Sequence, residues 1–591
     1  MQILIPDSWL REFIETDANP KQIQEALSLC GPSIERLHKK GSDYVYDIEV
    51  TTNRVDMMSV VGIARECAAI LPRFGYSAKL KIKNQNAKIN IKNKVDFLQV
   101  IVDKSLCHRF TAALIKNIKI GESSDIVKKR LELCGIRAIN NVVDISNYLM
   151  LEMGQPVHTF DYDKIAEHKM ILRESKKGEK ITTLDNKEFI LHGGDIVIED
   201  GDKRLVDLCG IMGGQNSAVD ENTKRVLLFV QVYEPSLIRK TSMSLAQRSN
   251  AAVLFEKGLA IENVLLTVER GIEMFGGTKH PVLDILNIKE TTKTIKLGKI
   301  DLGAEIKHEE IVKILTSLGF GVEGSVVTIP WWRKLDIDIH EDLVEEVARI
   351  YGYHNLPSVL MPGKLPDPVY DQTFFWESKI KSALSHWGFT ESYTYSLVDK
   401  DSGLKLKNPL SSEWECLRTN LTNSHIKIIS ENIGKVAELN FFEIANVYLP
   451  KEELHLILST SNKDSSRLKG FIEALFMELG TKIKFSIISH SNCLTCEMNL
   501  HEVLKSATTV KKFIPISKFS PIIEDVNVKL TNDYEKLIEK IKSYSKLINK
   551  IDFVDVYENK LTLRITYHDK SRQLSTVDIA PIRELVLHNL C

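Results

Sequence analysis

The stretch DIDIHEDLVEEVARIYGY, residues 336–353, says most about how this chain folds. Leu343, Val347 and Ile350 recur at helical spacing, which predicts the buried face of an amphipathic helix. The carboxylates of the helix and its approach include Asp336, Asp342, Glu345 and Glu346. Because clustered carboxylates repel one another, a hard dication such as Mg²⁺ would relieve that repulsion. Acids also favour a helix N-terminus through its dipole, and these residues alone favour this simpler explanation.

A small unit is predicted around the acidic helix. The segment HEEIVKILTSLGF predicts a helix, and SVVTIP predicts the strand that follows it. Between them GFGVEG, residues 319–324, has the glycine spacing of a dinucleotide fingerprint, which requires a strand before it and a helix after it. The order here is reversed, so we predict a turn and no nucleotide site.

Length and composition indicate a globular protein with several cores. A chain of 591 residues is expected to form about three to five domains. It is 43% hydrophobic and 27% charged, and no apolar run is long enough to cross a bilayer. The N-terminus lacks the pattern of a secretion signal, and nine scattered cysteines fit a reducing compartment. We therefore expect a cytoplasmic protein with no membrane partner.

The remaining segments read as mixed α/β structure. Residues 20–30 and 59–71 predict helices, with a strand between them at residues 44–50. Residues 107–275 and 368–509 each predict a domain of strands and helices. The last segment reads β-α-β-β-α, which is five of the six elements of a ferredoxin-like unit, with the final strand missing.

Other motifs point to chemistry only weakly. Cys493 and Cys496, with His490 and His501, could supply four tetrahedral zinc ligands. The spacing is unusual and no second CxxC supports it, so a loop with incidental thiols is favoured. The chain contains neither a GxxxxGK[ST] phosphate loop nor a GxSxG elbow, so no self-contained ATP site is predicted.

Two further segments combine turns with polar residues. INNVVDISNYLMLEMGQPVHTFD, residues 139–161, places a helix and a turn ahead of His158. LCGIMGGQNSAV, residues 208–219, has glycines that let the backbone approach a ligand closely. Glycine turns and a hydrogen-bonded histidine explain both segments equally well without any function.

Together and in this order, these segments resemble the beta subunit of bacterial-type phenylalanyl-tRNA synthetases from end to end. The matching blocks are SWL (8–10), DIEVTTNRVDMMSVVGIARE (47–66), INNVVDISNY (139–148), GQPVHTFD (154–161), GIMGG (210–214), EDLVEEVARIYGY (341–353), NPLSSEWECLRTNL (408–421), FFEIANVY (441–448) and SKF (517–519). The acidic helix and Asn-Asn-Val-Val-Asp are the most specific of them. The chain is identified as a shortened member of this family.

The resemblance implies a multidomain α+β architecture. The implied domains are an N-terminal α/β domain (1–95), a mixed α/β editing-type domain for aminoacyl-tRNA hydrolysis (96–285), a small winged-helix-like unit with the acidic magnesium helix (290–360), an inactive class II synthetase-like antiparallel-sheet domain (365–510) and a truncated ferredoxin-like anticodon-binding domain (513–591).

The resemblance also implies a function. Two alpha and two beta chains would attach phenylalanine to tRNA(Phe) with ATP, and the alpha chain would hold the aminoacylation site. The beta chain would contribute assembly, tRNA binding and Mg²⁺, the ion being bound by Asp336, Asp342, Glu345 and Glu346. It would also hydrolyse mischarged Tyr-tRNA in a pocket that includes His158, Gly210, Gly213, Gly214, Ser249 and Ala251.

Three departures from the family pattern matter. Where the family reads VLLE this chain reads VLLF, and Phe229 cannot accept a hydrogen bond from a tyrosine hydroxyl, which predicts weak tyrosine editing. Lys39-Lys40-Gly41 leads directly into YVYDIEV, so an inserted oligonucleotide-binding domain is absent. Ile523-Glu524 replaces a basic pair, for which Lys540, Lys542 and Lys546 could compensate unless they form a solvated helix face.

A different kind of protein is the alternative. The same architecture could serve a free-standing tRNA-binding protein or aminoacyl-tRNA deacylase. Association with an alpha chain would discriminate between the two hypotheses.

Overall fold

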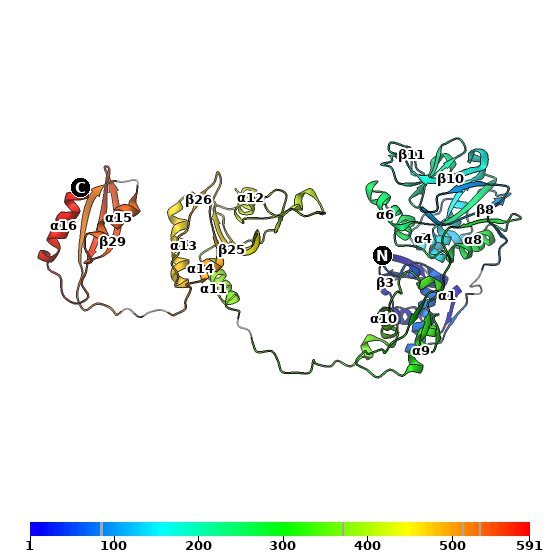
Figure 1. Cartoon of the computed structure of the whole chain (residues 1–591), viewed down its shortest axis with the longest axis horizontal. Coiled ribbons are helices and arrows are strands. Elements are labelled where there is room, and N and C mark those ends of the chain that lie inside the picture. The colour runs from blue at the N-terminus through cyan, green and yellow to red at the C-terminus, as the bar shows by residue number, and fades with distance from the viewer. Residues whose placement is uncertain (83–86, 369–370, 511–512, 514, 531–532, 591) are drawn as a thin grey trace. The chain divides into compact units, whose positions relative to one another are not determined.

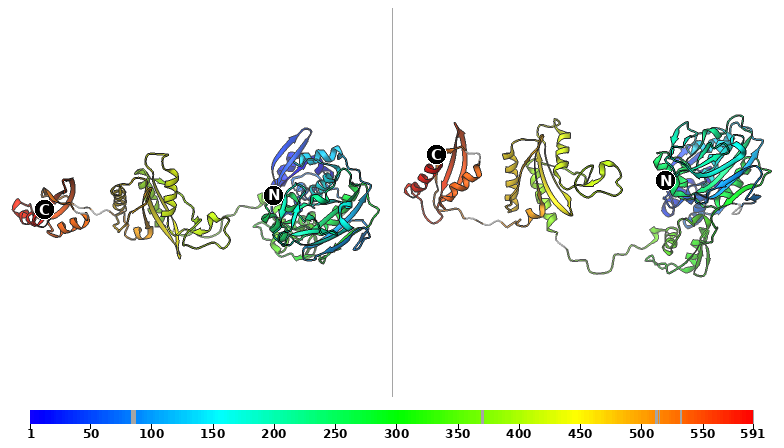
Figure 2. Two further views of the ribbon diagram at one scale, coloured as in Figure 1. Left: turned by 90° about the horizontal axis from the view of Figure 1, so that it is seen from above. Right: turned by 45° about the horizontal axis from the view of Figure 1, so that its top comes forward.

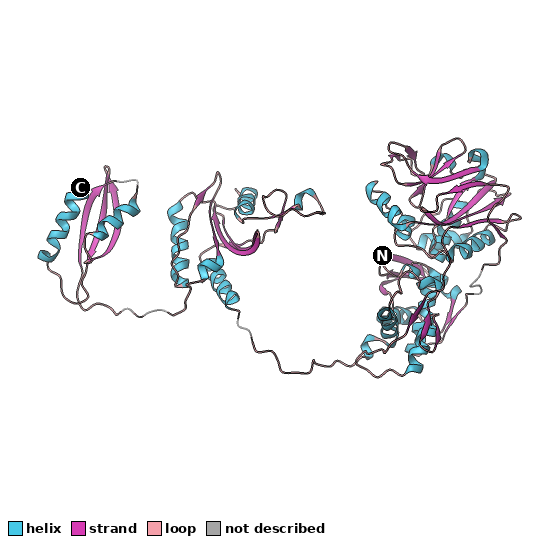
Figure 3. Cartoon of the chain, viewed as in Figure 1, coloured by secondary structure: helices cyan, strands magenta, loops and turns pink. Residues whose placement is uncertain are grey.

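The computed structural model describes residues 1–82, 87–368, 371–510, 513, 515–530 and 533–590 (Figure 1). The chain divides into two compact units, Met1–Gly363 and Lys364–Cys591. Both mix helices and strands (Figure 3). Within the described ranges, no helix is long and apolar enough to span a membrane.

The first unit begins with a three-stranded antiparallel sheet, ordered β1 (Gln2–Pro6), β4 (Asp43–Glu49), β3 (Ser33–Lys40). Lys40 pairs with Asp43, so only Gly41 and Ser42 form the turn between β3 and β4, with Gly41 at φ +62°. This confirms the direct connection expected from the sequence.

Two helices predicted from the sequence each begin at a residue whose side chain caps the helix N-terminus. Helix α2 (Pro20–Cys30) begins with a capping box, in which the Asn19 side chain accepts a hydrogen bond from the backbone of Gln22, and the Gln22 side chain accepts one from the Asn19 backbone. Helix α3 (Val60–Ile70) begins at Ser59, whose hydroxyl accepts a hydrogen bond from the Gly62 amide.

Residues 91–286 form a part with two five-stranded sheets, called here the two-sheet part. One sheet has the order β6 (Ile91–Lys92), β17 (Val282–Leu286), β8 (Cys107–Lys116), β16 (Arg225–Tyr233), β9 (His158–Asp161). The other has the order β15 (Met212–Gly213), β14 (Leu205–Leu208), β13 (Ile196–Asp200), β10 (Lys169–Glu174), β7 (Gln99–Val102).

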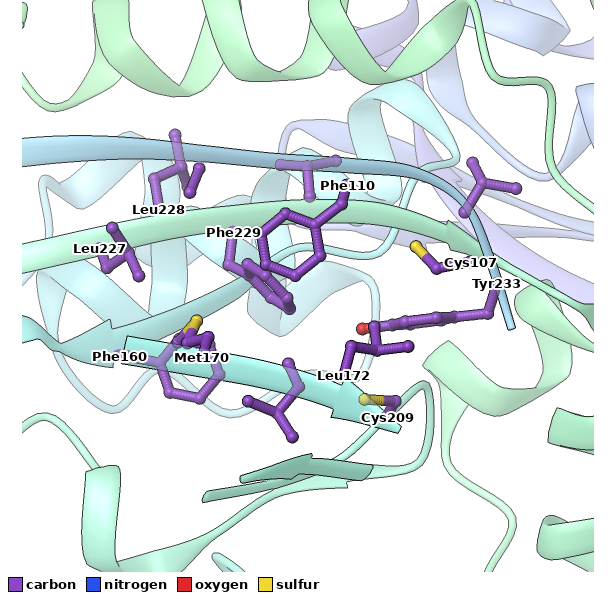
Figure 4. Close-up of a cluster of buried hydrophobic side chains, with 14 of the residues drawn as sticks. Cys107, Phe110, Phe160, Met170, Leu172, Cys209, Leu227, Leu228, Phe229 and Tyr233 are labelled. Carbon is purple, nitrogen blue, oxygen red and sulfur yellow. The ribbon is translucent and has the colours of Figure 1, made fainter. Parts of the chain in front are cut away.

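Apolar side chains from both sheets share one core. Phe110, Phe160 and Phe229 come from the first sheet and meet Met170 and Leu172 from the second (Figure 4). Helices α5 (Asn141–Met153) and α8 (Asn263–Met274) pack together, and α8 also packs on β8 and β16. Burial of this core leaves the polar residues at its margin as the candidates for function.

The small unit contains the acidic helix. Its sheet has the order β18 (Thr294–Lys296), β20 (Val326–Thr328), β19 (Gly321–Glu323), and its helices are α9 (His308–Ser317) and α10 (His340–Tyr351). The chain turns between α9 and β19 at Gly319, which has φ +91°. The predicted turn is therefore confirmed at Gly319, whereas Gly321–Glu323 of GFGVEG form β19.

The second unit carries a five-stranded sheet ordered β21 (Thr390–Glu391), β24 (Asn440–Leu449), β25 (Lys451–Thr460), β27 (Leu494–Asn499), β26 (Ile488–Ser489). All of its pairs are antiparallel except β21 with β24. Helices α11 (Gln372–His386) and α13 (Ser465–Leu479) contribute to the same core as this sheet.

The C-terminal segment has the five elements predicted for it, in the predicted order: β28 (Ile522–Lys529), α15 (Tyr534–Ser543), β29 (Ile548–Tyr557), β30 (Lys560–Tyr567) and α16 (Thr576–Leu590). Its antiparallel sheet is ordered β28, β30, β29. Figure 2 shows this segment in orange and red.

Candidate functional site

Two adjoining cavities lie in the two-sheet part. The larger has a volume of about 350 Å³ and is lined mainly by apolar groups, with polar groups that include Ser146, Asn147, Thr159, Ser249 and Asn250. The smaller has a volume of about 80 Å³. They share a wall that includes His158, Gly213 and Ala251, and together they are called the His158 pocket.

The structure brings together most of the residues predicted for editing. Besides the shared wall, Gly210 lines the smaller cavity and Ser249 lines the larger. Gly214 follows β15 and donates its amide to the Val206 carbonyl at 2.9 Å, and it lines neither cavity. Five of the six predicted positions therefore surround one pocket.

His158 is held by its packing. It lies on β9 opposite Phe229 of β16, and its ring packs edge-on against Phe160 with the centroids 4.4 Å apart. A Cβ atom at Gly213 would lie 2.3 Å from Cε1 of His158, so only glycine leaves room for the ring. Burial lowers the pKa of His158 to about 4, so the imidazole is neutral near pH 7.

The loop segments on either side of the pocket are also fixed. The Ser249 hydroxyl caps α7 (Asn250–Phe255) by accepting from the Ala252 amide, and it donates to the Ile211 carbonyl at 2.8 Å. Gly210 has φ +70°, and a Cβ there would lie 2.8 Å from Cδ1 of Ile238. The Ser249 hydrogen bond therefore ties the glycine loop to α7, and Gly210 fits where a larger residue would not.

Sequence reasoning missed the polar residues of the smaller cavity. Asp207, Gln231 and Tyr233 line it, and all three are buried. Burial raises the pKa of Asp207 to about 7, against a smaller lowering by a hydrogen bond with the Cys209 thiol. The sequence did contain one signal for this site, because Asp207 is the single carboxyl within the apolar run LVDLC.

Phe229 belongs to the core and not to the pocket wall. Its ring is fully buried and packs edge-on against Phe110 and Phe160, with centroid separations of 4.9 and 5.3 Å (Figure 4). It lines neither cavity of the His158 pocket. The ring thus contributes to packing rather than polar recognition here.

The acidic helix takes part in a second buried polar site, called here the charge cluster: Arg54, Glu66, Arg333, Asp336, Glu346 and Arg349. Arg333 donates from Nη1 to Glu346 at 2.7 Å and from Nη2 to Asp336 at 2.8 Å. Arg349 donates to Glu346 and to Glu66, both at 2.6 Å. Burial alone would raise the pKa of Glu346, but Arg349 and Arg333 hold it well below its ordinary value.

The four predicted magnesium ligands do not converge in this arrangement. Asp336 and Glu346 share the guanidinium of Arg333. Asp342 instead accepts from the backbone amides of Asp338 and Ile339, as a residue near a helix N-terminus does, and Glu345 is exposed. Over the described ranges, no group of three or more His, Cys, Asp or Glu side chains is placed to hold a metal ion. The four acids as placed do not fit a dication.

The predicted thiol pair lies in the second unit. Cys493 and Cys496 are both buried, and burial raises the pKa of Cys496 to about 12. His490 contacts the Thr495 hydroxyl at 2.9 Å. Burial therefore makes these thiols poor nucleophiles.

Three known protein domains match successive segments of this chain. Family models match a B3/4 domain at residues 106–278, a tRNA synthetase B5 domain at 296–353 and a phenylalanyl tRNA synthetase beta chain CLM domain at 356–494. The His158 pocket lies in the first match and α10 in the second.

Two curated relatives cover most of the chain. The phenylalanine–tRNA ligase beta subunit of Dehalococcoides mccartyi (strain CBDB1) is 31% identical, over 82% of this chain and 70% of the relative. That of Clostridium acetobutylicum is 30% identical, over 96% of this chain and 80% of the relative. Among solved structures, an N-terminal fragment of the phenylalanyl-tRNA synthetase beta subunit from Pyrococcus horikoshii matches with a TM-score of 0.36 at 15% identity, covering 59% of this chain and 99% of that one. The domain matches and the two relatives show that the chain belongs to the phenylalanine–tRNA ligase beta subunit family.

Proposed function

We propose that this chain works as the beta subunit of a cytoplasmic phenylalanine–tRNA ligase. Two such chains and two alpha chains would attach phenylalanine to tRNA(Phe) with ATP, and the alpha chain would hold the aminoacylation site. The observation that carries this proposal is the succession of three family domains along one chain. Relatives matched over most of their length are named as beta subunits, which favours this function over a free-standing deacylase.

We propose that each domain has a separate role. The boundaries are those expected from the sequence: 1–95 N-terminal, 96–285 for editing, 290–360 for the winged-helix-like unit, 365–510 for an inactive synthetase-like domain and 513–591 for a ferredoxin-like domain. The His158 pocket would hydrolyse the ester of a mischarged tRNA. Neutral His158 could hydrogen-bond the attacking water or the terminal ribose, while the apolar cavity held the amino-acid side chain.

The second unit offers a surface for the alpha chain. Tyr393 and Leu410 are 94% and 101% exposed, and Tyr395 and Leu404 are each 68% exposed. Large apolar side chains with such exposure in one region are typical of a protein–protein interface. We propose that this region contacts the alpha chain.

The C-terminal segment would contact tRNA weakly. Lys540, Lys542 and Lys546 are exposed at the end of α15 and beyond it, and they could neutralise phosphates. Glu524, which replaces part of a basic pair, forms an ion pair with Arg583 and so neutralises a cation that could contact a phosphate. Mg²⁺ enters the proposal with ATP, bound mainly by the alpha chain. The four acids of the sequence prediction could receive an ion only if Arg333 first released Asp336 and Glu346.

Co-expression with the alpha chain from the same genome tests the proposal. The two chains are expected to co-purify, and the pair should charge tRNA(Phe) with phenylalanine while neither chain does so alone. A chain that stays monomeric beside its alpha partner, or a pair without charging activity, would refute the proposed function.

A further inference from the structure

The His158 pocket contains a single carboxyl group. The described residues that line the larger cavity include no Asp, Glu, Lys or Arg, and those of the smaller cavity include only Asp207 from these four types. The smaller cavity, at about 80 Å³, exceeds the ~10–15 Å³ that one water needs, so the end of a ligand side chain can enter it. Among the described residues that line this end of the pocket, Asp207 supplies the only carboxyl, beside the polar groups of His158, Gln231 and Tyr233.

The strand pairing places Asp207 beside His158. Asp207 lies on β14 and pairs with Gly213 of β15. Side chains of directly paired residues lie on the same face of a sheet, with Cβ atoms about 5 Å apart. The His158 ring occupies the space that a Gly213 side chain would fill. The carboxyl and the imidazole are consequently neighbours on one wall of the pocket.

Asp207 is buried without a counter-charge from the described residues. The residue is 4% exposed, and within that part of the chain it forms no ion pair. Its hydrogen-bond neighbour is the Cys209 thiol, which is a weak donor. An uncompensated buried carboxyl destabilises a protein, and such groups are concentrated at functional sites.

The neighbouring polar groups leave acceptors without donors. Gln231 donates from Nε2 to the Thr111 carbonyl, and Tyr233 donates to Oε1 of Gln231 at 3.4 Å. Gln155, next to Pro156 of the pocket wall, donates to the Gln231 carbonyl, while its own buried Oε1 has no partner. Gln231 and Tyr233 thus direct these hydrogen bonds to acceptors other than Asp207, and a hydroxyl of a ligand in the smaller cavity can donate to its carboxyl.

We propose that Asp207 determines the specificity of the His158 pocket by accepting a hydrogen bond from a hydroxyl at the end of an aminoacyl side chain. The larger cavity holds the apolar part of that side chain, and the smaller cavity receives its polar end. The ligand class is an aminoacyl ester of tRNA whose side chain is apolar with a terminal hydroxyl. This inference rests on the proposed editing function.

The inference competes with the prediction made from Phe229. If hydroxyl recognition required an acceptor at position 229, this chain would hydrolyse Tyr-tRNA poorly. Asp207 supplies an acceptor from a different strand, so this chain is expected to hydrolyse Tyr-tRNA despite Phe229.

The test uses the purified complex with the alpha chain and measures deacylation of Tyr-tRNA(Phe) and Phe-tRNA(Phe). The complex should prefer the tyrosyl ester, and Asp207→Leu should lower the ratio of the two rates at least about tenfold. Asp207→Asn keeps an acceptor oxygen and should hold the ratio within about threefold. Glu199→Gln on β13, outside both cavities, is the matched control and should leave the ratio unchanged.

The outcomes separate the inference from the function on which it rests. Charging with phenylalanine reports that each variant is folded. If Tyr-tRNA is hydrolysed and Asp207→Leu leaves the ratio unchanged, or if the unmodified complex hydrolyses both esters equally, the Asp207 inference is overturned and editing stands. If the unmodified complex charges tRNA but hydrolyses neither ester, the editing function fails and the inference fails with it.

Discussion

The charge cluster and the His158 pocket both bury carboxylates within the first unit, with opposite electrostatic results. Glu346 is 2% exposed and receives hydrogen bonds from two arginines, which hold its pKa well below the ordinary value. Asp207 is 4% exposed and forms no ion pair with any described residue, so burial raises its pKa to about 7. Burial alone therefore does not decide the state of an acid. The presence of a counter-charge does.

This difference distinguishes buried acids that stabilise the fold from a buried acid that is available to a ligand. The charge cluster joins α3, α10 and the loop before α10, and each of its described acids contacts a guanidinium. Such a site resists change because removing one partner leaves a buried charge. Asp207 is already buried without a partner charge in the described ranges, and such destabilising groups are concentrated at sites that bind ligands.

Breaking the charge cluster should have the largest effect. Arg333→Met removes the guanidinium shared by Asp336 and Glu346, and it should destabilise the first unit by about 3–5 kcal/mol. Thermal unfolding of the full chain measures this. Lys180→Met, which removes an exposed pair with Glu188, is the control and should cost at most about 1 kcal/mol. Equal shifts for the two variants would contradict the structural role of the cluster.

The pH dependence of stability should reveal Asp207 next. Its folded pKa of about 7 lies above the ordinary 3.8, so the folded state holds this proton more tightly. The resulting stability is complete below about pH 4 and is lost as the pH rises through 7, amounting to at most about 4 kcal/mol.

Asp207→Asn removes this contribution because the amide does not titrate. Between pH 4 and pH 8, the unfolding midpoint of the parent should fall with rising pH more than the midpoint of the variant does. Parallel curves would show that Asp207 does not carry a raised pKa.

Adding a methyl group at Gly213, beside the His158 ring, should lower the rate of deacylation more than it lowers the stability of the fold. A Cβ at position 213 would lie 2.3 Å from the ring, so Gly213→Ala should displace His158. Deacylation should fall at least about tenfold, or ~1.4 kcal/mol, while charging with phenylalanine is kept. Gly121→Ala, with open space around its Cβ, is the control. Unchanged deacylation would remove His158 from the proposed chemistry.

Chelation should have the smallest effect. Because Arg333 and Arg349 already neutralise Glu346, EDTA is expected to leave the unfolding temperature of the isolated chain unchanged. Scans with EDTA and with added Mg²⁺ make the measurement. A stabilisation by Mg²⁺ that Glu345→Gln abolished would instead support the predicted ion site.

Local pattern was enough to predict several elements. The apolar spacing of Leu343, Val347 and Ile350 predicted the buried face of α10, and all three are buried. The turn at Gly319 and the βαββα order of the last segment were predicted in the same way. These features depend on residues close together in the chain, where propensity and periodicity act directly.

The sequence by itself determined the family, the order of the domains and the faces of the helices. Only the tertiary structure decided which cations from distant parts of the chain lie beside the buried acids, although Arg333 and Arg349 are also three residues from Asp336 and Glu346. Arg349 meets Glu66 across a sequence separation of 283 residues, whereas Asp207 meets no arginine or lysine among the described residues of its pocket. Neither relation has a local signal, because a carboxylate responds to the charges around it in space and not to its neighbours along the chain.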